Sequence, residues 1–187
     1  MYIKMSKIGK RPISIPFGIY IEIKNHTIIV SGPLGELSQR ISSRLQLEVK
    51  KNNQEIKLKI FTFSKEDHSL HGLYRALIHN MFVGVTKGFT KELELVGVGY
   101  RVFVKGQRLE ITLGFSHNII IETPTEIKVE TKSEKGKNPI IKLKSHNKQL
   151  LGIVAAKIRS FKKPDVYQGK GIRYVGEEVR KKLGKSA

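Results

Sequence analysis

The sequence contains the same pattern twice: a series of short segments in which apolar and polar residues alternate, followed by one amphipathic segment. Alternation indicates strands with one buried face, because successive side chains of a strand point to opposite faces. In the first half the alternating runs include residues 19–24 and 56–60, and Asn25-His26 supplies a turn signal. From Leu70 to Val85 apolar residues recur at steps of three and four, which predicts a helix.

The second half repeats this plan. Strands are expected at residues 92–96, 100–104, 108–113, 119–122, 127–131 and 140–144, and a helix from Leu150 to Phe161. Residues 71–78 align with residues 151–158, with a glycine, an alanine and an isoleucine in register. Chance similarity between two amphipathic helices is the alternative explanation. We prefer an internal duplication and predict an α+β protein of two similar small domains, residues 1–84 and 85–187, each an antiparallel-rich sheet packed against one helix.

The charge of the chain indicates its partner. The 187 residues include 35 Lys and Arg against 16 Asp and Glu, a formal net charge of +19. Such a charge repels itself and weakens a compact state, whereas binding to nucleic acid releases a counterion for each neutralised phosphate. Nucleic acid is therefore the expected partner, with an anionic membrane surface as the second choice. The 31 residues from Lys157 onward hold 10 basic and 3 acidic groups, so we expect binding to concentrate there.

No arrangement of residues in the sequence supports catalysis or a bound cofactor. The absence of cysteine excludes disulfides, thiolate metal ligands and cysteine nucleophiles. His68 and His71 have no paired carboxylate at ligand spacing, so we interpret them as surface or helix-start histidines and not as zinc ligands. Ser116 and His117 are neighbours in sequence, which says nothing about a catalytic triad. We therefore expect no enzyme activity, no metal and no cofactor.

The segment from Phe161 to Tyr174 is the strongest candidate for a nucleic-acid contact. Pro164 ends the preceding helix, because its ring excludes a further helical turn. Two glycines flank Lys170 and allow the backbone to approach a phosphate, while Arg173 offers a planar fork suited to phosphate or to a base edge. Two tyrosines offer stacking faces and hydroxyl groups suited to irregular RNA. The alternative is a solvated loop whose tyrosines pack on the core.

Five motifs, in order along the chain, resemble those of the sixth large-subunit ribosomal protein family in its bacterial or organellar type. They are Ser6-Lys-Ile-Gly-Lys-Arg-Pro12, Val30-Ser-Gly-Pro-Leu-Gly-Glu-Leu37, Leu95-Val-Gly-Val-Gly-Tyr-Arg101, Leu113-Gly-Phe-Ser-His117 and Pro164-Asp-Val-Tyr-Gln-Gly-Lys-Gly-Ile-Arg-Tyr174. At the last motif the family usually reads Pro-Glu-Pro-Tyr-Lys-Gly-Lys-Gly. This chain departs from it at Asp165, Val166 and Gln168, and Gln168 lacks the positive charge of the family's lysine.

The resemblance covers nearly the whole chain and implies a fold, a function and a site. It implies two similar α+β domains and a non-enzymatic structural constituent of the large ribosomal subunit. It also implies binding to large-subunit ribosomal RNA near the sarcin–ricin loop, beside the landing site of translational GTPases, with neighbouring ribosomal proteins as further partners. The family makes most of its RNA contact through the C-terminal domain. The predicted RNA-binding residues are Lys162, Lys163, Tyr167, Gly169, Lys170, Gly171, Arg173, Tyr174, Arg180, Lys181 and Lys182.

Two other functions remain open, and the compartment is open as well. A general nucleic-acid chaperone or architectural protein would need the same charge but no fixed target. An enzyme acting on an acidic substrate is a more remote possibility. The richness in Ile, Lys and Asn indicates an AT-rich gene, so we expect a ribosome in an algal plastid (a chloroplast) or in a bacterium, with the mitochondrial matrix less favoured. We expect no targeting segment and no transmembrane helix, since no apolar run approaches the roughly 20 residues required.

Overall fold

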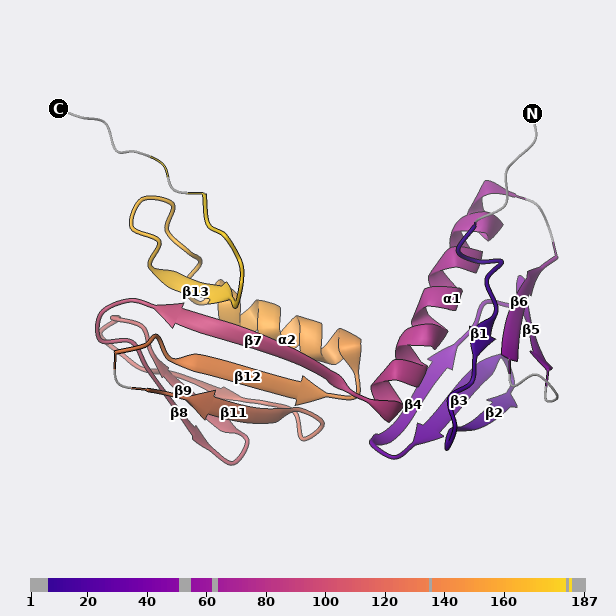
Figure 1. Cartoon of the computed structure of the whole chain (residues 1–187), viewed down its shortest axis with the longest axis horizontal. Coiled ribbons are helices and arrows are strands. Elements are labelled where there is room, and N and C mark those ends of the chain that lie inside the picture. The colour runs from indigo at the N-terminus through magenta and orange to yellow at the C-terminus, as the bar shows by residue number, and fades with distance from the viewer. Residues whose placement is uncertain (1–6, 51–54, 62–63, 135, 181, 183–187) are drawn as a thin grey trace. The chain divides into compact units, whose positions relative to one another are not determined.

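The chain folds into two compact units. The computed structural model describes residues 7–50, 55–61, 64–134, 136–180 and 182. The N-terminal unit spans Met1–Gly88 and the C-terminal unit spans Phe89–Ala187 (Figure 1). The predicted boundary after residue 84 lies inside a helix that continues to Thr86, so the division between the units follows the end of that helix.

The N-terminal unit packs one helix against two small antiparallel sheets. Its elements are β1 (Ile13–Ser14), β2 (Tyr20–Lys24), β3 (Thr27–Gly32), β4 (Gly35–Arg40), β5 (Leu45–Lys50), β6 (Glu55–Ile60) and α1 (Lys65–Thr86). One sheet has the order β2-β3-β4 and the other β1-β6-β5. Asn25 and His26 join β2 to β3 with φ angles of 45° and 61°, as a tight hairpin turn requires. In the core, Phe82 of α1 lies buried with Ile28 of β3 and Ile56 of β6.

The C-terminal unit repeats this construction and adds a strand. Its elements are β7 (Phe89–Val96), β8 (Arg101–Lys105), β9 (Arg108–Thr112), β10 (Ile119–Glu122), β11 (Lys128–Lys132), β12 (Ile140–Ser145), α2 (Lys148–Ser160) and β13 (Gly171–Tyr174). One sheet has the order β8-β9-β10 and the other β11-β12-β7-β13. The helix α2 packs against β7, β12 and β13 (Figure 1). Leu151, Ala155 and Ile158 of α2 are fully buried there, together with Leu93 and Ile141.

The strand orders of the two units correspond one to one. The sheet β1-β6-β5 matches β7-β12-β11, the sheet β2-β3-β4 matches β8-β9-β10, and each unit's helix follows its sixth strand. This correspondence confirms the prediction of an α+β protein with two similar units. Only β13 lacks a counterpart among the described strands of the N-terminal unit.

The helix α1 begins earlier than its apolar periodicity indicates. It starts at Lys65, whereas the spacing of apolar residues becomes visible only at Leu70. Ser64 is the N-cap, and its hydroxyl accepts a hydrogen bond from the backbone N–H of Asp67 at 3.1 Å. The first turn is polar, so hydrophobic periodicity does not detect it. Within the described part of the chain, neither helix is long and apolar enough to span a membrane.

His68 and His71 lie in the first turns of α1, but they are buried. The two residues are 8% and 2% exposed, so of the two alternatives predicted, helix-start and surface histidines, the structure supports the helix start. The Nε2 atom of His71 lies 3.1 Å from the carbonyl oxygen of Leu58, and its ring packs so closely against Gly9 that a Cβ there would clash. The contacts come from β6 and from the segment before β1, which the periodicity of α1 cannot reveal. The described residues contain no group of three His, Cys, Asp or Glu placed to hold a metal ion.

Candidate nucleic-acid interface

The chain leaves α2 through a loop and returns as β13 along the edge of β7. The pairing is antiparallel, with Ile172 opposite Leu95 and Tyr174 opposite Leu93. Ile172 is fully buried in the core of the C-terminal unit. Because α2 precedes the loop 161–170 and β13 follows it, both of its ends are held by packed elements.

Asp165 organises the turn within this loop. Its carboxylate Oδ2 accepts a hydrogen bond from the backbone N–H of Gln168 at 2.7 Å. Its backbone N–H donates to the carbonyl of Lys170 at 2.8 Å, and its carbonyl accepts from Gly169 at 2.9 Å. Aspartate favours such turns because its short side chain reaches the backbone of the residues that follow. Asp165, one of the departures from the family motif, therefore stabilises the turn that presents residues 166–168.

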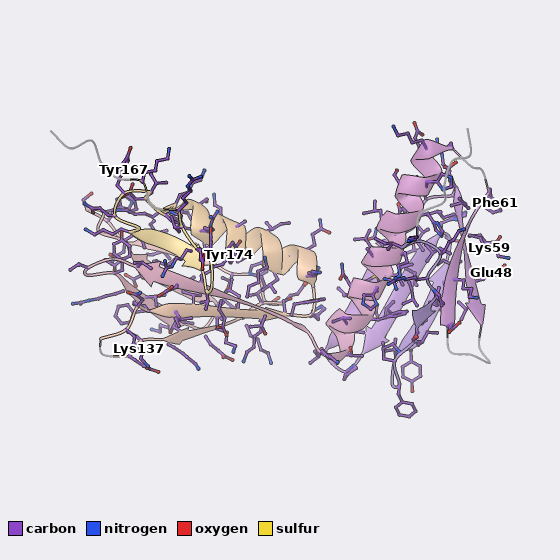
Figure 2. The ribbon with its side chains drawn as sticks, turned by 45° about the horizontal axis from the view of Figure 1, so that its top comes forward. Glu48, Lys59, Phe61, Lys137, Tyr167 and Tyr174 are labelled. Carbon is purple, nitrogen blue, oxygen red and sulfur yellow. The ribbon has the colours of Figure 1, made fainter. Side chains whose placement is uncertain are left out.

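Part of the predicted site is exposed to solvent. The exposed members are Lys163, Tyr167, Lys170, Arg180 and Lys182. Tyr167 is 59% exposed and lies on the loop, away from the sheet (Figure 2). The backbone N–H of Lys182 donates to the carbonyl of Val166 at 2.9 Å, so the C-terminal tail returns to the loop. Lys181 lies outside the described residues. The loop and the tail thus bring exposed cations and an exposed ring together, an arrangement suited to phosphates and bases.

Arg173, by contrast, is engaged within the unit. Its Nε donates to Oε2 of Glu94 at 3.0 Å, while the side-chain amide of Asn138 donates to Oε1 at 2.7 Å. Burial alone would raise the pKa of the Glu94 carboxyl, but the hydrogen bonds from Asn138 and Arg173 outweigh it and hold that pKa below its ordinary value of 4.5. Arg173 therefore anchors β13 to β7, and a contact from its guanidinium to RNA stays a prediction.

Tyr174 is also occupied by intramolecular contacts. Its ring centroid lies 4.9 Å from Nζ of Lys91 and 5.6 Å from the guanidinium carbon of Arg159. Glu177 pairs with Arg159 and accepts a hydrogen bond from the backbone N–H of Tyr174 at 2.9 Å. That hydrogen bond lowers the pKa of the Glu177 carboxyl; burial opposes the shift and Arg159 adds to it. Of the two predicted tyrosines, Tyr167 is thus free to stack, and Tyr174 packs on the unit (Figure 2).

The two predicted glycines have intramolecular reasons for being glycine. Both are buried, and their φ angles are 72° at Gly169 and 143° at Gly171. A Cβ at Gly171 would lie 2.7 Å from the carbonyl oxygen of Lys163 and 2.7 Å from the Cα of Pro164. The backbone approach that glycine permits here is to the chain itself. Contact of these glycines with a phosphate stays a prediction from the sequence.

Lys162 is turned into the unit. Its Nζ donates to the carbonyl of Leu113 at 3.0 Å and lies 4.4 Å from the ring centroid of Phe115 and 5.7 Å from that of Tyr100. These contacts join the segment after α2 to the β9–β10 hairpin and to the residues before β8. The sequence did not predict that the β9–β10 hairpin lies beside the segment after α2. Its only sequence signal was the family motif Leu113–His117, which does not say where the hairpin lies.

The fold and this surface define a class of protein: a duplicated α+β protein whose C-terminal unit exposes several cations and an aromatic ring. The family described as Ribosomal protein L6 matches residues 15–88 and 96–175, one match in each unit. Two bacterial relatives, both called large ribosomal subunit protein uL6, match nearly the whole chain. That of Flavobacterium psychrophilum is 54% identical over 183 residues, covering 98% of this chain and 100% of its own length. That of Bacteroides fragilis is 53% identical over 186 residues, covering 98% of each.

The chain belongs to the ribosomal protein L6 family. Members of this family are structural proteins of the ribosome and not enzymes, so the predictions of the family and of a non-catalytic role are confirmed.

Proposed function

We propose that this ribosomal protein is a structural constituent of the large ribosomal subunit and binds its RNA near the sarcin–ricin loop, beside the landing site of translational GTPases. The names of the relatives support membership of the large subunit. The resemblance of the motif 164–174 to the family supports the position near the sarcin–ricin loop. Neighbouring ribosomal proteins are the proposed further partners.

The proposal that the protein binds RNA rests on the exposed loop between α2 and β13. Lys163 and Lys170 are exposed and have no ion-pair partner within the described part of the chain, and Tyr167 stands beside them with 59% of its surface exposed. Cations of this kind neutralise phosphates, and an exposed ring offers a stacking face to a base. Because packed elements hold both ends of the loop, RNA binding does not require the loop to become ordered first. A loop held in this way rigidifies the RNA that binds to it.

We further propose a bacterial ribosome as the site of action, with a plastid ribosome as the second choice. The relatives from Flavobacterium psychrophilum and Bacteroides fragilis match at more than half of all positions over nearly the full chain. That similarity favours a bacterium over a plastid, and composition alone does not separate the two.

The test is the salt dependence of binding to a large-subunit RNA fragment that contains the sarcin–ricin stem, compared with a scrambled fragment. The double variant Lys163→Ala/Lys170→Ala is expected to lose affinity and to lower the slope of log affinity against log salt by about two, one for each lost phosphate contact. The matched control Lys24→Ala/Lys59→Ala removes the same charge from the N-terminal unit. Its lysines are exposed and lie in surface ion pairs, and it is expected to bind as the wild type does.

Three outcomes are informative. Preference for the native fragment that depends on Lys163 and Lys170 supports the proposal. Equal binding of the wild type to both fragments, with equal effects of the two double variants, would replace it with a general nucleic-acid chaperone. Selective binding that neither double variant changes would keep the function and move the site away from the loop.

A further inference from the structure

The β9–β10 hairpin presents an ordered aromatic pair at its tip. Residues 114–118 are all exposed, and Phe115 is 42% exposed. The hydroxyl of Thr112 donates to Oδ1 of Asn118 at 3.1 Å, and the side-chain amide of Asn118 donates to Glu110 at 2.8 Å. These bonds hold the two strands together where the loop leaves them. The tip is therefore constrained at its base although its residues are exposed to solvent.

The two rings at this tip are stacked. The centroids of Phe115 and His117 are 6.0 Å apart, with an angle of 16° between the ring planes. One face of His117 is turned toward Phe115, and the residue as a whole is exposed. A pair already aligned in this way loses little conformational freedom when a third flat group stacks on it. Because His117 is exposed, its ring is accessible to a planar ligand.

Lys162 connects this pair to the exposed loop. Its Nζ contacts both the ring of Phe115 and the carbonyl of Leu113, while its own carbonyl accepts a hydrogen bond from the backbone of Ile172 at 2.8 Å. Lys162 therefore links the hairpin tip to the start of β13. Lys163 follows Lys162 directly in the chain, so an RNA strand bound at Lys163 lies next to the residue that contacts Phe115.

From this geometry we propose that Phe115 and His117 form a second RNA-binding site, which stacks an unpaired base on His117. An unpaired RNA base is the planar ligand that suits the position, because the phosphates of the same strand find cations next to it and every base has a face that can stack. Phe115 stacks with His117, and Lys162 contacts the ring of Phe115 from within the unit. The proposal rests on the RNA-binding function proposed above and extends the site beyond the C-terminal segment.

The experiment measures binding of the full chain to the same sarcin–ricin fragment over a series of salt concentrations. His117→Ala is expected to weaken binding roughly 5- to 150-fold, the range measured for loss of a base–aromatic stack, and to leave the salt slope unchanged. His117→Tyr restores a ring and is expected to bind nearly as the wild type does. His117→Lys supplies a cation without a ring and is expected to stay weak. Phe17→Ala removes an aromatic that is 98% exposed on the N-terminal unit and serves as the matched control.

Three kinds of result would overturn the inference. Wild-type affinity of His117→Ala, in a preparation where Lys163→Ala/Lys170→Ala is weakened, would confine the site to the loop and leave the proposed function intact. Rescue by His117→Lys, with a salt slope lowered by about one in His117→Ala, would make His117 a phosphate contact and not a stacking platform. If the wild type shows no preference for the native fragment, the proposed function fails, and the stacking site fails with it.

Discussion

The two units share their strand order and differ at one edge of one sheet. In the N-terminal unit β1 has two residues and pairs, among the described strands, with β6 alone. In the C-terminal unit the corresponding β7 has eight residues and pairs with β12 on one side and β13 on the other. A longer strand offers more backbone hydrogen-bonding groups along its edge, and this edge can hold a further strand. The added strand, in turn, holds the loop with the exposed lysines.

The surface charge of the units differs in the same direction. Residues 12–39 of the N-terminal unit contain one cation, Lys24, which pairs with Glu22. The last 31 residues of the chain contain ten cations. The shared fold therefore does not determine where an anion binds. The site that we propose lies on what distinguishes the C-terminal unit from the N-terminal one, as is common when one architecture carries different sites.

The largest expected effect is on the free energy of unfolding and on RNA binding. It compares β13 with β1 of the other unit through an equally buried isoleucine in each strand. Ile172→Ala on β13 and Ile13→Ala on β1 each truncate a buried isoleucine, 0% and 1% exposed. Each is expected to lower the free energy of unfolding by about 2–5 kcal/mol. Only Ile172→Ala is expected to weaken RNA binding as well. Denaturant unfolding followed by circular dichroism, together with the RNA-binding assay, measures both; equal loss of affinity would break the comparison.

A smaller effect on stability is expected at Gly171, where the backbone of β13 lies against the loop backbone at Lys163 and Pro164. Gly171→Ala puts a Cβ on a residue with a φ of 143° and within 2.7 Å of backbone atoms of Lys163 and Pro164. We expect a loss of stability of about 1–3 kcal/mol from backbone strain, with additional loss from the clash. The contrasting control is Gly152→Ala on α2, where a Cβ meets nothing within 4 Å. Since alanine favours helix, Gly152→Ala should raise the melting temperature and Gly171→Ala should lower it.

The smallest effect is a pH dependence that Glu94 and Glu177 give to the C-terminal unit. The pKa values of the Glu94 and Glu177 carboxyls lie below 4.5 in the folded protein. Their contribution to stability is therefore fully present above about pH 4.5 and is lost as the pH falls through the lower folded-state values. Glu94→Gln is expected to flatten this loss, measured by denaturant unfolding between about pH 6 and pH 3.

The control for the pH dependence is Glu48→Gln in the N-terminal unit, where Glu48 forms a surface ion pair with Lys59 (Figure 2). Exposed pairs contribute little to stability, so this variant should keep the acid dependence of the wild type. If Glu48→Gln flattens the curve as much as Glu94→Gln does, the anchoring of β13 is not the source of the effect.

Much of the fold could be predicted from local patterns. Alternation and the three-to-four spacing are properties of neighbouring residues, so they indicated strands, helices and their repetition. They missed the polar first turn of α1, because its start depends on the cap at Ser64. They allowed for His68 and His71 at a helix start but did not indicate their burial, because the atoms that contact the His71 ring come from other elements. The local sequence around a residue does not predict which other elements pack on it.

The sequence by itself determined the class of fold, the duplication, the family and the concentration of charge near the C-terminus, because each of these is a property of composition or of order along the chain. The tertiary structure decided which predicted site residues face solvent. Arg173 meets Glu94 across 79 positions, and Lys162 meets Leu113 across 49. Such pairs form only in the folded unit, since no local pattern specifies a partner so distant in the chain. The pairing of β13 with β7 places Arg173 beside Glu94, and the packing of the segment after α2 on the β9–β10 hairpin turns Lys162 inward, whereas Lys163, Tyr167 and Lys170 are exposed.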